Sequence, residues 1–215
     1  LLEKAKVAAR QCEKVVLCVG LPERYESEGF DRGSLKLPEG HLRLINAVTE
    51  ENANTIVILM SGGVVECPWA GKVKGILYAG LSGQAGAQAI ANILYGKVNP
   101  SGKLAESWPI NYEDCATAAF YGKEKDVIYR EGIYVGYRYY DKIQLPVRWC
   151  FGYGLSYTTF AYSNLKIQEP EPSEQIRQLQ KNNQIEKIKR LQKDIGKQTK
   201  DLKEEYVVSC DITNT

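Results

Sequence analysis

Two clusters of carboxylates and aromatic residues could carry out acid–base chemistry. The first is the tyrosine-rich segment 129–140, in which Glu131 comes directly before Gly132. A glutamate in front of a glycine can lie at a turn with its side chain presented outward. Aromatic neighbours can stack on sugar rings and partly desolvate the carboxyl group, which favours the protonated form that an acid catalyst needs. Taken alone, a glutamate beside tyrosines is more often an ordinary surface carboxylate.

The second cluster is segment 25–32, in which Glu26, Glu28 and Asp31 precede Arg32. Arg32 could pair with any of the three, and a loop held by such a salt bridge is the simpler interpretation. The alternative is direct contact with a sugar, or an acid role for Glu28. Glycosidic bonds are generally hydrolysed by two carboxyl groups that flank the scissile bond, so both clusters are candidates for that chemistry.

The elements that must position these residues alternate between strands and helices. Continuous apolar runs predict buried parallel strands at 14–20, 55–60 and 74–79. Amphipathic periodicity predicts helices at 1–12, 38–52 and 82–95. This alternation is typical of an α/β fold with a doubly wound, mostly parallel sheet. Ligands bind at the carboxyl ends of such strands, which here are the loop 21–37 and the turn Ser61, Gly62 and Gly63.

Residues 161–215 follow a different pattern from residues 1–160, so we expect a second domain there. Segments 162–167 and 206–213 alternate like strands. Between them, about 173–205, apolar residues recur at helical spacing and predict a long helix or a helical hairpin. We expect its apolar stripe to pack on its own chain; coiled-coil pairing with a partner, and hence an oligomer, is the alternative.

Several ordered stretches resemble the second, α/β sandwich domain of family-three glycoside hydrolases, above all the β-glucosidases. They are segments 26–32, 37–38, 61–69, 91–96, 99–104, 131–140 and 151–160. The resemblance runs from about residue 12 to residue 167. No single stretch would identify the family, but so many stretches in the same order and at the proper spacing are specific to it. It implies that the segments 162–167 and 206–213 are the first strands of a fibronectin-type β-sandwich, with 173–205 as a helical insertion.

The resemblance also implies a retaining mechanism in which an Asp on a neighbouring (β/α)8-type barrel is the nucleophile. A Glu of the sandwich domain is then the acid/base, and it falls on Glu131, with Glu28 as the second choice. The turn at Ser61 and Gly62 is implied to face the sugar site. The further candidates for contact with the substrate are Asp31, Arg32 and Tyr129.

Two departures from the family pattern affect what we expect. Segment 82–86 reads Ser-Gly-Gln-Ala-Gly and lacks the Glu that the family usually has there. The barrel and its nucleophile are absent, and both ends of the sequence look cut, so we expect a fragment that is inactive alone. The barrel would be supplied by the same or another chain.

The resemblance implies a β-glucoside or oligosaccharide with a terminal β-D-glucosyl residue as the substrate. The alternatives are a β-xylosidase of the same family, or a non-catalytic carbohydrate-binding or assembly module.

Composition excludes several other classes of protein. Of the 215 residues 44% are hydrophobic and 25% charged, with a formal net charge of +2, which argues against nucleic acid or a membrane surface as partner. No apolar run approaches the roughly 20 residues that span a bilayer. Because no phosphate-binding glycine loop follows the first strand, a nucleotide-binding domain is poorly supported.

The cysteine and histidine pattern argues against a bound metal or other cofactor. None of the six cysteines forms a Cys-x-x-Cys pair, and His41 is the only histidine, so the sequence argues against a zinc site. Cys18 lies in an apolar strand, which predicts a buried free thiol. Free thiols fit a reducing compartment, and we expect a cytoplasmic protein.

Overall fold

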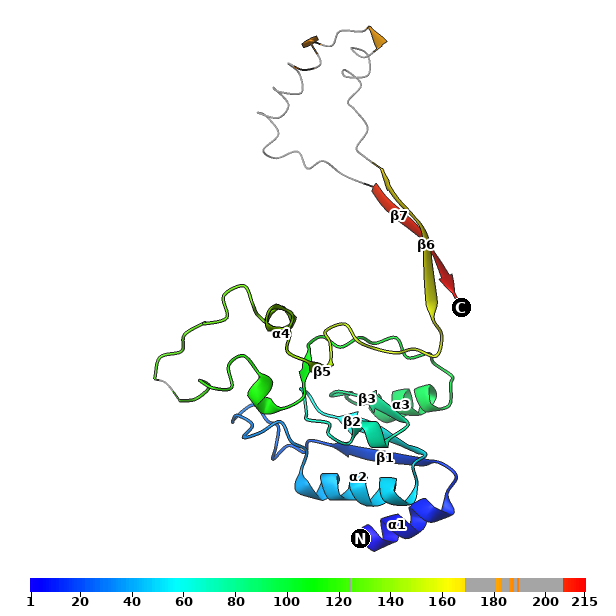
Figure 1. Ribbon diagram of the computed structural model, residues 1–215. Helices are drawn as coiled ribbons and strands as arrows, with labels where there is room; N and C mark the ends of the chain where they lie inside the picture. The colour runs from blue at the N-terminus through cyan, green and yellow to red at the C-terminus, as the bar shows by residue number, and fades with distance from the viewer. Residues whose placement is uncertain (124, 169–180, 183–185, 188, 190–206) are drawn as a thin grey trace. The chain divides into compact units, whose positions relative to one another are not determined.

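A computed structural model describes residues 1–123, 125–168, 181–182, 186–187, 189 and 207–215 (Figure 1). The chain divides into two compact units, Leu1–Tyr157 and Thr158–Thr215. The division therefore lies between residues 157 and 158, three residues before the boundary between 160 and 161 that the sequence predicts. Most of the predicted helical segment 173–205 lies outside the described residues. The prediction that this segment could form an oligomer concerns the same residues.

A three-stranded parallel sheet forms the centre of the first unit. Its strands β1 (Val15–Gly20), β2 (Thr55–Met60) and β3 (Gly75–Tyr78) lie in the order β1-β2-β3. Five of the six side chains of β2 are buried or half-buried, which explains its uninterrupted apolar sequence. The α/β class is confirmed, and each strand lies within one residue of its predicted bounds.

The described sheet differs from the predicted doubly wound arrangement. A doubly wound sheet reverses its strand order, whereas the three parallel strands described here advance in one direction from β1 to β3. β1 is consequently an edge strand of the described sheet. The prediction that Cys18 is buried is wrong for the same reason: its thiol is exposed because no described element covers that part of β1.

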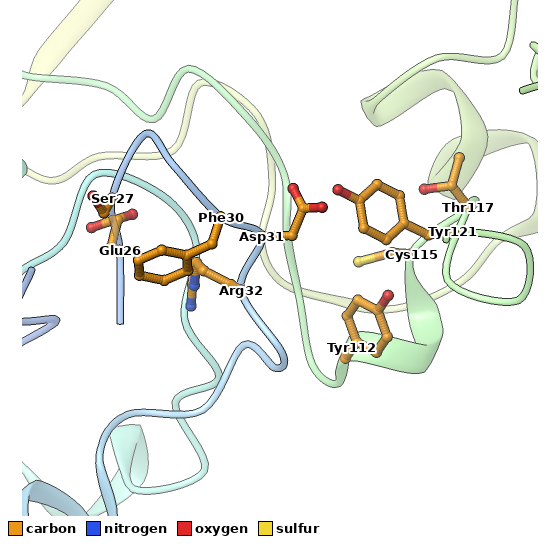
Figure 2. Close-up of a pocket in the computed structure, with 9 residues that line it drawn as sticks. All are labelled: Glu26, Ser27, Phe30, Asp31, Arg32, Tyr112, Cys115, Thr117 and Tyr121. Atoms are coloured by element: carbon orange, nitrogen blue, oxygen red, sulfur yellow. The ribbon is translucent and has the colours of Figure 1, made fainter. Parts of the chain in front are cut away.

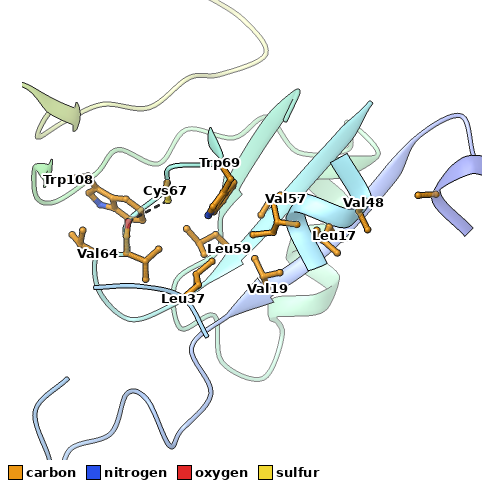
Figure 3. Close-up of a cluster of buried hydrophobic side chains, with 13 residues drawn as sticks. Leu17, Val19, Leu37, Val48, Val57, Leu59, Val64, Cys67, Trp69 and Trp108 are labelled. Carbon is orange, nitrogen blue, oxygen red and sulfur yellow. Dashed lines mark hydrogen bonds between the residues drawn. The ribbon is translucent and has the colours of Figure 1, made fainter. Parts of the chain in front are cut away.

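Two helices cover one face of the sheet and enclose the main core (Figure 3). The helix α1 (Leu2–Gln11) packs against α2 (Glu39–Glu51), and α2 packs against β1. The buried cluster between them contains Ala9, Leu17, Val19, Ile45, Val48, Val57 and Leu59. A third helix, α3 (Gly86–Leu94), begins later than the predicted residue 82, because Gly83 has a left-handed φ of 61° that a helix cannot contain.

The sequence pattern did not predict five short elements, of which two strands extend this core. β4 (Trp108–Pro109) pairs antiparallel with β5 (Val147–Trp149). The indole of Trp108 is 1% exposed and makes edge contacts with Tyr78 and Trp149, at ring-centroid distances of 5.2 and 5.3 Å. The other elements are the 3-10 turns η1 (Ala70–Lys72) and η2 (Tyr112–Asp114) and the helix α4 (Tyr137–Ile143), which begins inside the tyrosine-rich segment.

The second unit contains an antiparallel pair of strands, β6 (Phe160–Gln168) and β7 (Val207–Asn214), as predicted. Tyr162 lies opposite Ile212 and Ile167 opposite Val208, with a bulge between these two pairs. All four of these apolar side chains are more than half exposed. In neither unit does a described helix have the length and apolar character needed to cross a membrane.

We expect the ion pair that joins α1 to α2 to make stability depend on pH. Arg10 donates through Nε and Nη2 to both carboxylate oxygens of Glu51, at 2.5 and 2.6 Å, and these hydrogen bonds lower the pKa of Glu51 below its ordinary 4.5. Because the pKa is lower in the folded state, the contribution is complete above pH 4.5 and is lost as pH falls through the lowered value.

A Glu51→Gln variant should therefore unfold at lower denaturant concentration than the unaltered chain at pH 7. That difference should shrink steadily below pH 4.5. Urea denaturation curves of both proteins between pH 7 and pH 3 make the comparison, and a gap that stays constant over this range would contradict the assignment.

Candidate functional site

The turn at the carboxyl end of β2 is fixed by buried contacts. Ser61 is fully buried; its Oγ donates to the Gly63 carbonyl at 2.8 Å, and its own carbonyl accepts a hydrogen bond from the Tyr78 hydroxyl at 2.9 Å. Burial raises the pKa of Tyr78, so the hydroxyl remains a donor. The burial of Ser61 makes this side chain a support for the turn, and Gly62 is the residue of the turn that is exposed.

The loop 21–37 is attached to this turn by hydrogen bonds to backbone groups. Glu26 Oε2 accepts from the Gly62 amide at 2.7 Å, and Arg32 Nη1 donates to the Val64 carbonyl at 2.8 Å. Within the described residues, Arg32 is not in ion-pair contact with any carboxylate. The predicted salt bridge is therefore replaced by two contacts to the chain that follows β2.

Opposite charges nevertheless surround Arg32. Burial lowers the pKa of its guanidinium, and the negative charges of Glu26 and Glu106 oppose that effect. Burial also raises the pKa of Glu106, which the charge of Arg32 partly offsets. Arg32 Nη2 is buried without a hydrogen-bond partner among the described residues. The site thus holds a desolvated cation whose hydrogen-bonding capacity is not fully used, which is an uncommon state for a buried group.

A pocket of about 380 Å³ opens beside this loop (Figure 2). Residues 26–32 form one wall and residues 112–121 the other, and Figure 2 shows Asp31 facing Tyr121 across it. A hydrogen bond to Asp31 raises the pKa of Tyr121. The second wall is anchored where the Tyr112 amide donates to Glu66 Oε1 at 3.0 Å. The lining residues are Glu26, Ser27, Phe30, Asp31, Arg32, Tyr112, Cys115, Thr117 and Tyr121.

Cys115 connects this pocket to the tyrosine-rich segment. Its thiol shares a hydrogen bond with the hydroxyl of Tyr140 in α4, and burial raises the pKa of both groups. The thiol therefore stays protonated near neutral pH and is a poor nucleophile. The contact has a structural consequence, because it fixes α4 against the segment that forms the second wall.

Glu131 lies in the turn that precedes α4, as its position before a glycine predicts. Gly132 has a left-handed φ of 57°, and the Tyr134 amide donates to the Glu131 carbonyl at 2.9 Å. Glu131 is half-buried, whereas Tyr129 is 89% exposed. The guanidinium of Arg130 lies 4.6 Å from the ring centre of Phe120, which joins this turn to the neighbouring segment.

The structure brings together only part of the predicted set. Asp31 and Arg32 line the pocket, and Gly62 is hydrogen-bonded to its wall, whereas Glu131, Tyr129 and Glu28 are not among its lining residues. Sequence reasoning missed Glu106, which carries charge next to Arg32 although it is distant in sequence. The sequence offered one indication, a carboxylate directly before the segment Ser-Trp-Pro at 107–109, which the structure buries. The described residues contain no group of three or more His, Cys, Asp or Glu side chains that could hold a metal.

Comparison with curated proteins gives consistent relatives for most of the chain. The thermostable β-glucosidase B of Acetivibrio thermocellus is 46% identical over 175 residues, which are 81% of this chain and 23% of that protein. A probable β-glucosidase J of Neosartorya fischeri is 44% identical, over 80% of this chain and 20% of the relative. The chain thus spans about a fifth to a quarter of the length of these relatives.

Solved structures of similar proteins agree with these relatives. The family 3 β-glucosidase of Bifidobacterium adolescentis superposes with a TM-score of 0.75 at 45% identity, over 79% of this chain and 26% of that one. A β-glucosidase of Kluyveromyces marxianus, solved in complex with glucose, gives a TM-score of 0.74 at 41% identity, over 78% of this chain and 20% of that one. The sequence profile of the glycosyl hydrolase family 3 C-terminal domain matches residues 1–137. The chain belongs to glycosyl hydrolase family 3, of which it carries the C-terminal domain.

Proposed function

We propose that this chain is the part of a retaining β-glucosidase that supplies the general acid/base, and that Glu131 is that residue. The observation that carries the proposal is the 46% identity to a β-glucosidase across a segment that includes the tyrosine-rich turn. The half-buried position of Glu131 supports the proposal, because its carboxyl remains accessible to a sugar that stacks on the exposed aromatic residues beside it.

In this mechanism the nucleophile is an Asp on a barrel domain that is not part of the 215 residues. The Asp attacks the anomeric carbon while Glu131 donates its proton to the glycosidic oxygen, and the aglycone leaves as an alcohol. The ionised Glu131 then removes a proton from water, which attacks the same carbon and releases the sugar and the free Asp. The two carboxyl groups must approach to about 5–5.5 Å for this double displacement.

Several other residues are proposed to contact the substrate. Gly62 is exposed beside Glu26, and Asp31 lies in a pocket with aromatic walls, an arrangement that suits a sugar ring with its hydroxyl groups. Arg32 lines the same pocket and is a further proposed contact. Tyr129, which is 89% exposed, can stack on a ring. Glucose is the proposed terminal sugar because the relatives are named β-glucosidases, one of them solved with glucose.

The second unit is proposed to begin a further domain. The pair β6 and β7 has apolar side chains that are more than half exposed, and a two-stranded hairpin alone is marginally stable in water. A fibronectin-type β-sandwich would cover this surface with further strands.

The purified chain should not hydrolyse an aryl β-glucoside, because only one member of the carboxylate pair is present. Release of nitrophenol measured over hours at high protein concentration tests this expectation. Turnover by the isolated chain that persists in a Glu131→Gln variant would show that another pair of groups performs the reaction.

In a chimera in which this chain replaces the aligned residues of the A. thermocellus enzyme, Glu131→Ala should lower kcat for a nitrophenyl glucoside by roughly 100- to 10,000-fold. Azide should restore part of that activity, because a small anion can attack the glycosyl-enzyme without a general base. Glu28→Ala is the matched control and should retain most of the activity. If the losses are exchanged between the two variants, Glu28 is the acid/base.

Gly62→Ala should disturb the turn more than Gly63→Ala does. A Cβ at Gly62 would lie 3.0 Å from Leu81 Cδ1 and 3.1 Å from Glu26 Oε1, whereas a Cβ at Gly63 would lie 3.6 Å from its nearest atom. We expect the first change to reduce kcat/KM of the chimera by about tenfold, equivalent to ~1.4 kcal/mol, and the second to leave it nearly unchanged. Equal effects would remove Gly62 from the proposed contact surface.

A further inference from the structure

Contacts on two sides hold the turn that carries Glu131. On one side, the guanidinium of Arg130 lies over the ring of Phe120, 4.6 Å from its centre. On the other side, the ammonium group of Lys142 in α4 lies 5.7 Å from the ring centre of Tyr134, whose amide donates to the Glu131 carbonyl. A cation–π contact at an exposed site is weak on its own, so the position of the turn depends on what holds Phe120 and α4.

The segment 112–121, the second wall of the pocket, holds both of these partners (Figure 2). Phe120 belongs to the segment, and its amide donates to the Thr117 carbonyl at 2.9 Å. In the same segment the Ala118 amide donates to the Cys115 carbonyl at 3.0 Å, and the Cys115 thiol shares a hydrogen bond with the Tyr140 hydroxyl of α4. The contacts therefore form a closed ring, which runs from the segment to α4, from α4 to the turn, and from the turn back to the segment.

This ring of contacts is attached to the buried part of the first unit through Glu66. The Glu66 side chain is largely buried, and its Oε1 accepts a hydrogen bond from the Tyr112 amide at 3.0 Å. Its amide donates to the Leu35 carbonyl at 2.8 Å, in the loop 21–37 that forms the other wall. The Cys115 amide donates in turn to the Tyr112 carbonyl at 3.0 Å. Hydrogen bonds thus connect both walls of the pocket to the thiol that contacts α4.

We propose that Tyr140 and Cys115 are positioning residues for the general acid/base, because their hydrogen bond closes the ring of contacts that places the carboxyl group of Glu131. The inference rests on the proposed role of Glu131. A proton donor must be held within about 0.5 Å of its productive position, and a displacement of about 1 Å can cost about 100-fold in rate. Burial raises the pKa of both groups of the pair, so both remain protonated near neutral pH and the hydrogen bond persists there.

Tyr140→Phe tests the proposal, because it removes only the hydroxyl group. In the chimera with the A. thermocellus enzyme, kcat/KM for phenyl glucoside should fall about tenfold, since this poor leaving group must be protonated as it departs. kcat/KM for dinitrophenyl glucoside, whose phenolate departs without a proton, should fall by less than about twofold. A variant that merely loses part of its folded population would lower both values by the same factor, so equal losses would overturn the proposal.

Three further variants are the controls. Tyr139→Phe removes a neighbouring hydroxyl that has no hydrogen-bond partner among the described residues, and it should leave both rates unchanged. Cys115→Ala should reproduce the selective loss of Tyr140→Phe, and the double variant should be no slower than either single one, because both changes delete the same hydrogen bond. Cys115→Ser keeps a hydrogen-bonding group and should recover most of kcat/KM for phenyl glucoside. Additive losses in the double variant would contradict the assignment.

The same two substrates separate a failure of this inference from a failure of the proposed function. If Glu131→Ala loses activity selectively with phenyl glucoside while Tyr140→Phe loses it equally with both, Glu131 is the proton donor and the pair has only a structural role. If Glu131→Ala shows no selectivity, the proposed function fails and this inference fails with it.

Hydrogen exchange in the isolated chain tests the ring of contacts without catalysis. Mass spectrometry of peptic peptides should show faster amide exchange at 131–136 in Tyr140→Phe than in Tyr139→Phe, with equal protection of β2 in both variants. If β2 also loses protection, Cys115→Ala takes the place of Tyr140→Phe. Equal exchange at 131–136 in a variant of the pair and in the Tyr139→Phe control, with β2 protected, would overturn the proposal.

Discussion

The hydrogen bond from the Tyr78 hydroxyl to the buried carbonyl of Ser61 fixes the point from which the candidate site is built. The parallel register places the ends of β2 and β3 at one edge, so a side chain from β3 can reach the turn after β2. Leaving a buried carbonyl unpaired would cost about 1–3 kcal/mol. Trp108 packs against the ring of Tyr78 and holds the donor in place. The exposed Gly62 and the attached loop depend on this support.

Electrostatics then adds a second constraint. Arg32 is partly desolvated between the charges of Glu26 and Glu106, and burial shifts the pKa of the arginine down and that of Glu106 up. Both pKa shifts favour the neutral forms of these side chains, and the attraction between Arg32 and Glu106 makes both shifts smaller. Such an arrangement is common where a protein must meet a polar ligand or a charged surface, because the desolvated groups gain most when a further partner completes their hydrogen bonds. The position of Arg32 beside the pocket agrees with that expectation.

The sequence predicted the three strands of the central sheet, the pair β6 and β7, and the family, but it did not predict β4, β5 or the contacts at the site. Continuous apolar runs located β2 because both of its faces are covered. The same kind of apolar run led to the wrong prediction that Cys18 is buried, because the run does not show whether a neighbouring strand covers β1. The turn at Ser61 was predicted to face the sugar site, but no local pattern shows that Ser61 is fully buried or that its carbonyl accepts a hydrogen bond from Tyr78, 17 positions later. The charge of Glu106 beside Arg32 depends on a tertiary approach that no local pattern contains.

A leaving-group series tests most directly whether Glu131 is the proton donor. In the chimera, kcat/KM should be compared between the unaltered protein and Glu131→Ala for aryl glucosides whose phenols range from strongly to weakly acidic. A strongly acidic phenol departs without protonation, so the account predicts a small loss for dinitrophenyl glucoside and a loss that grows steeply as the phenol becomes a poorer leaving group. A loss of the same size for every aglycone would contradict the account.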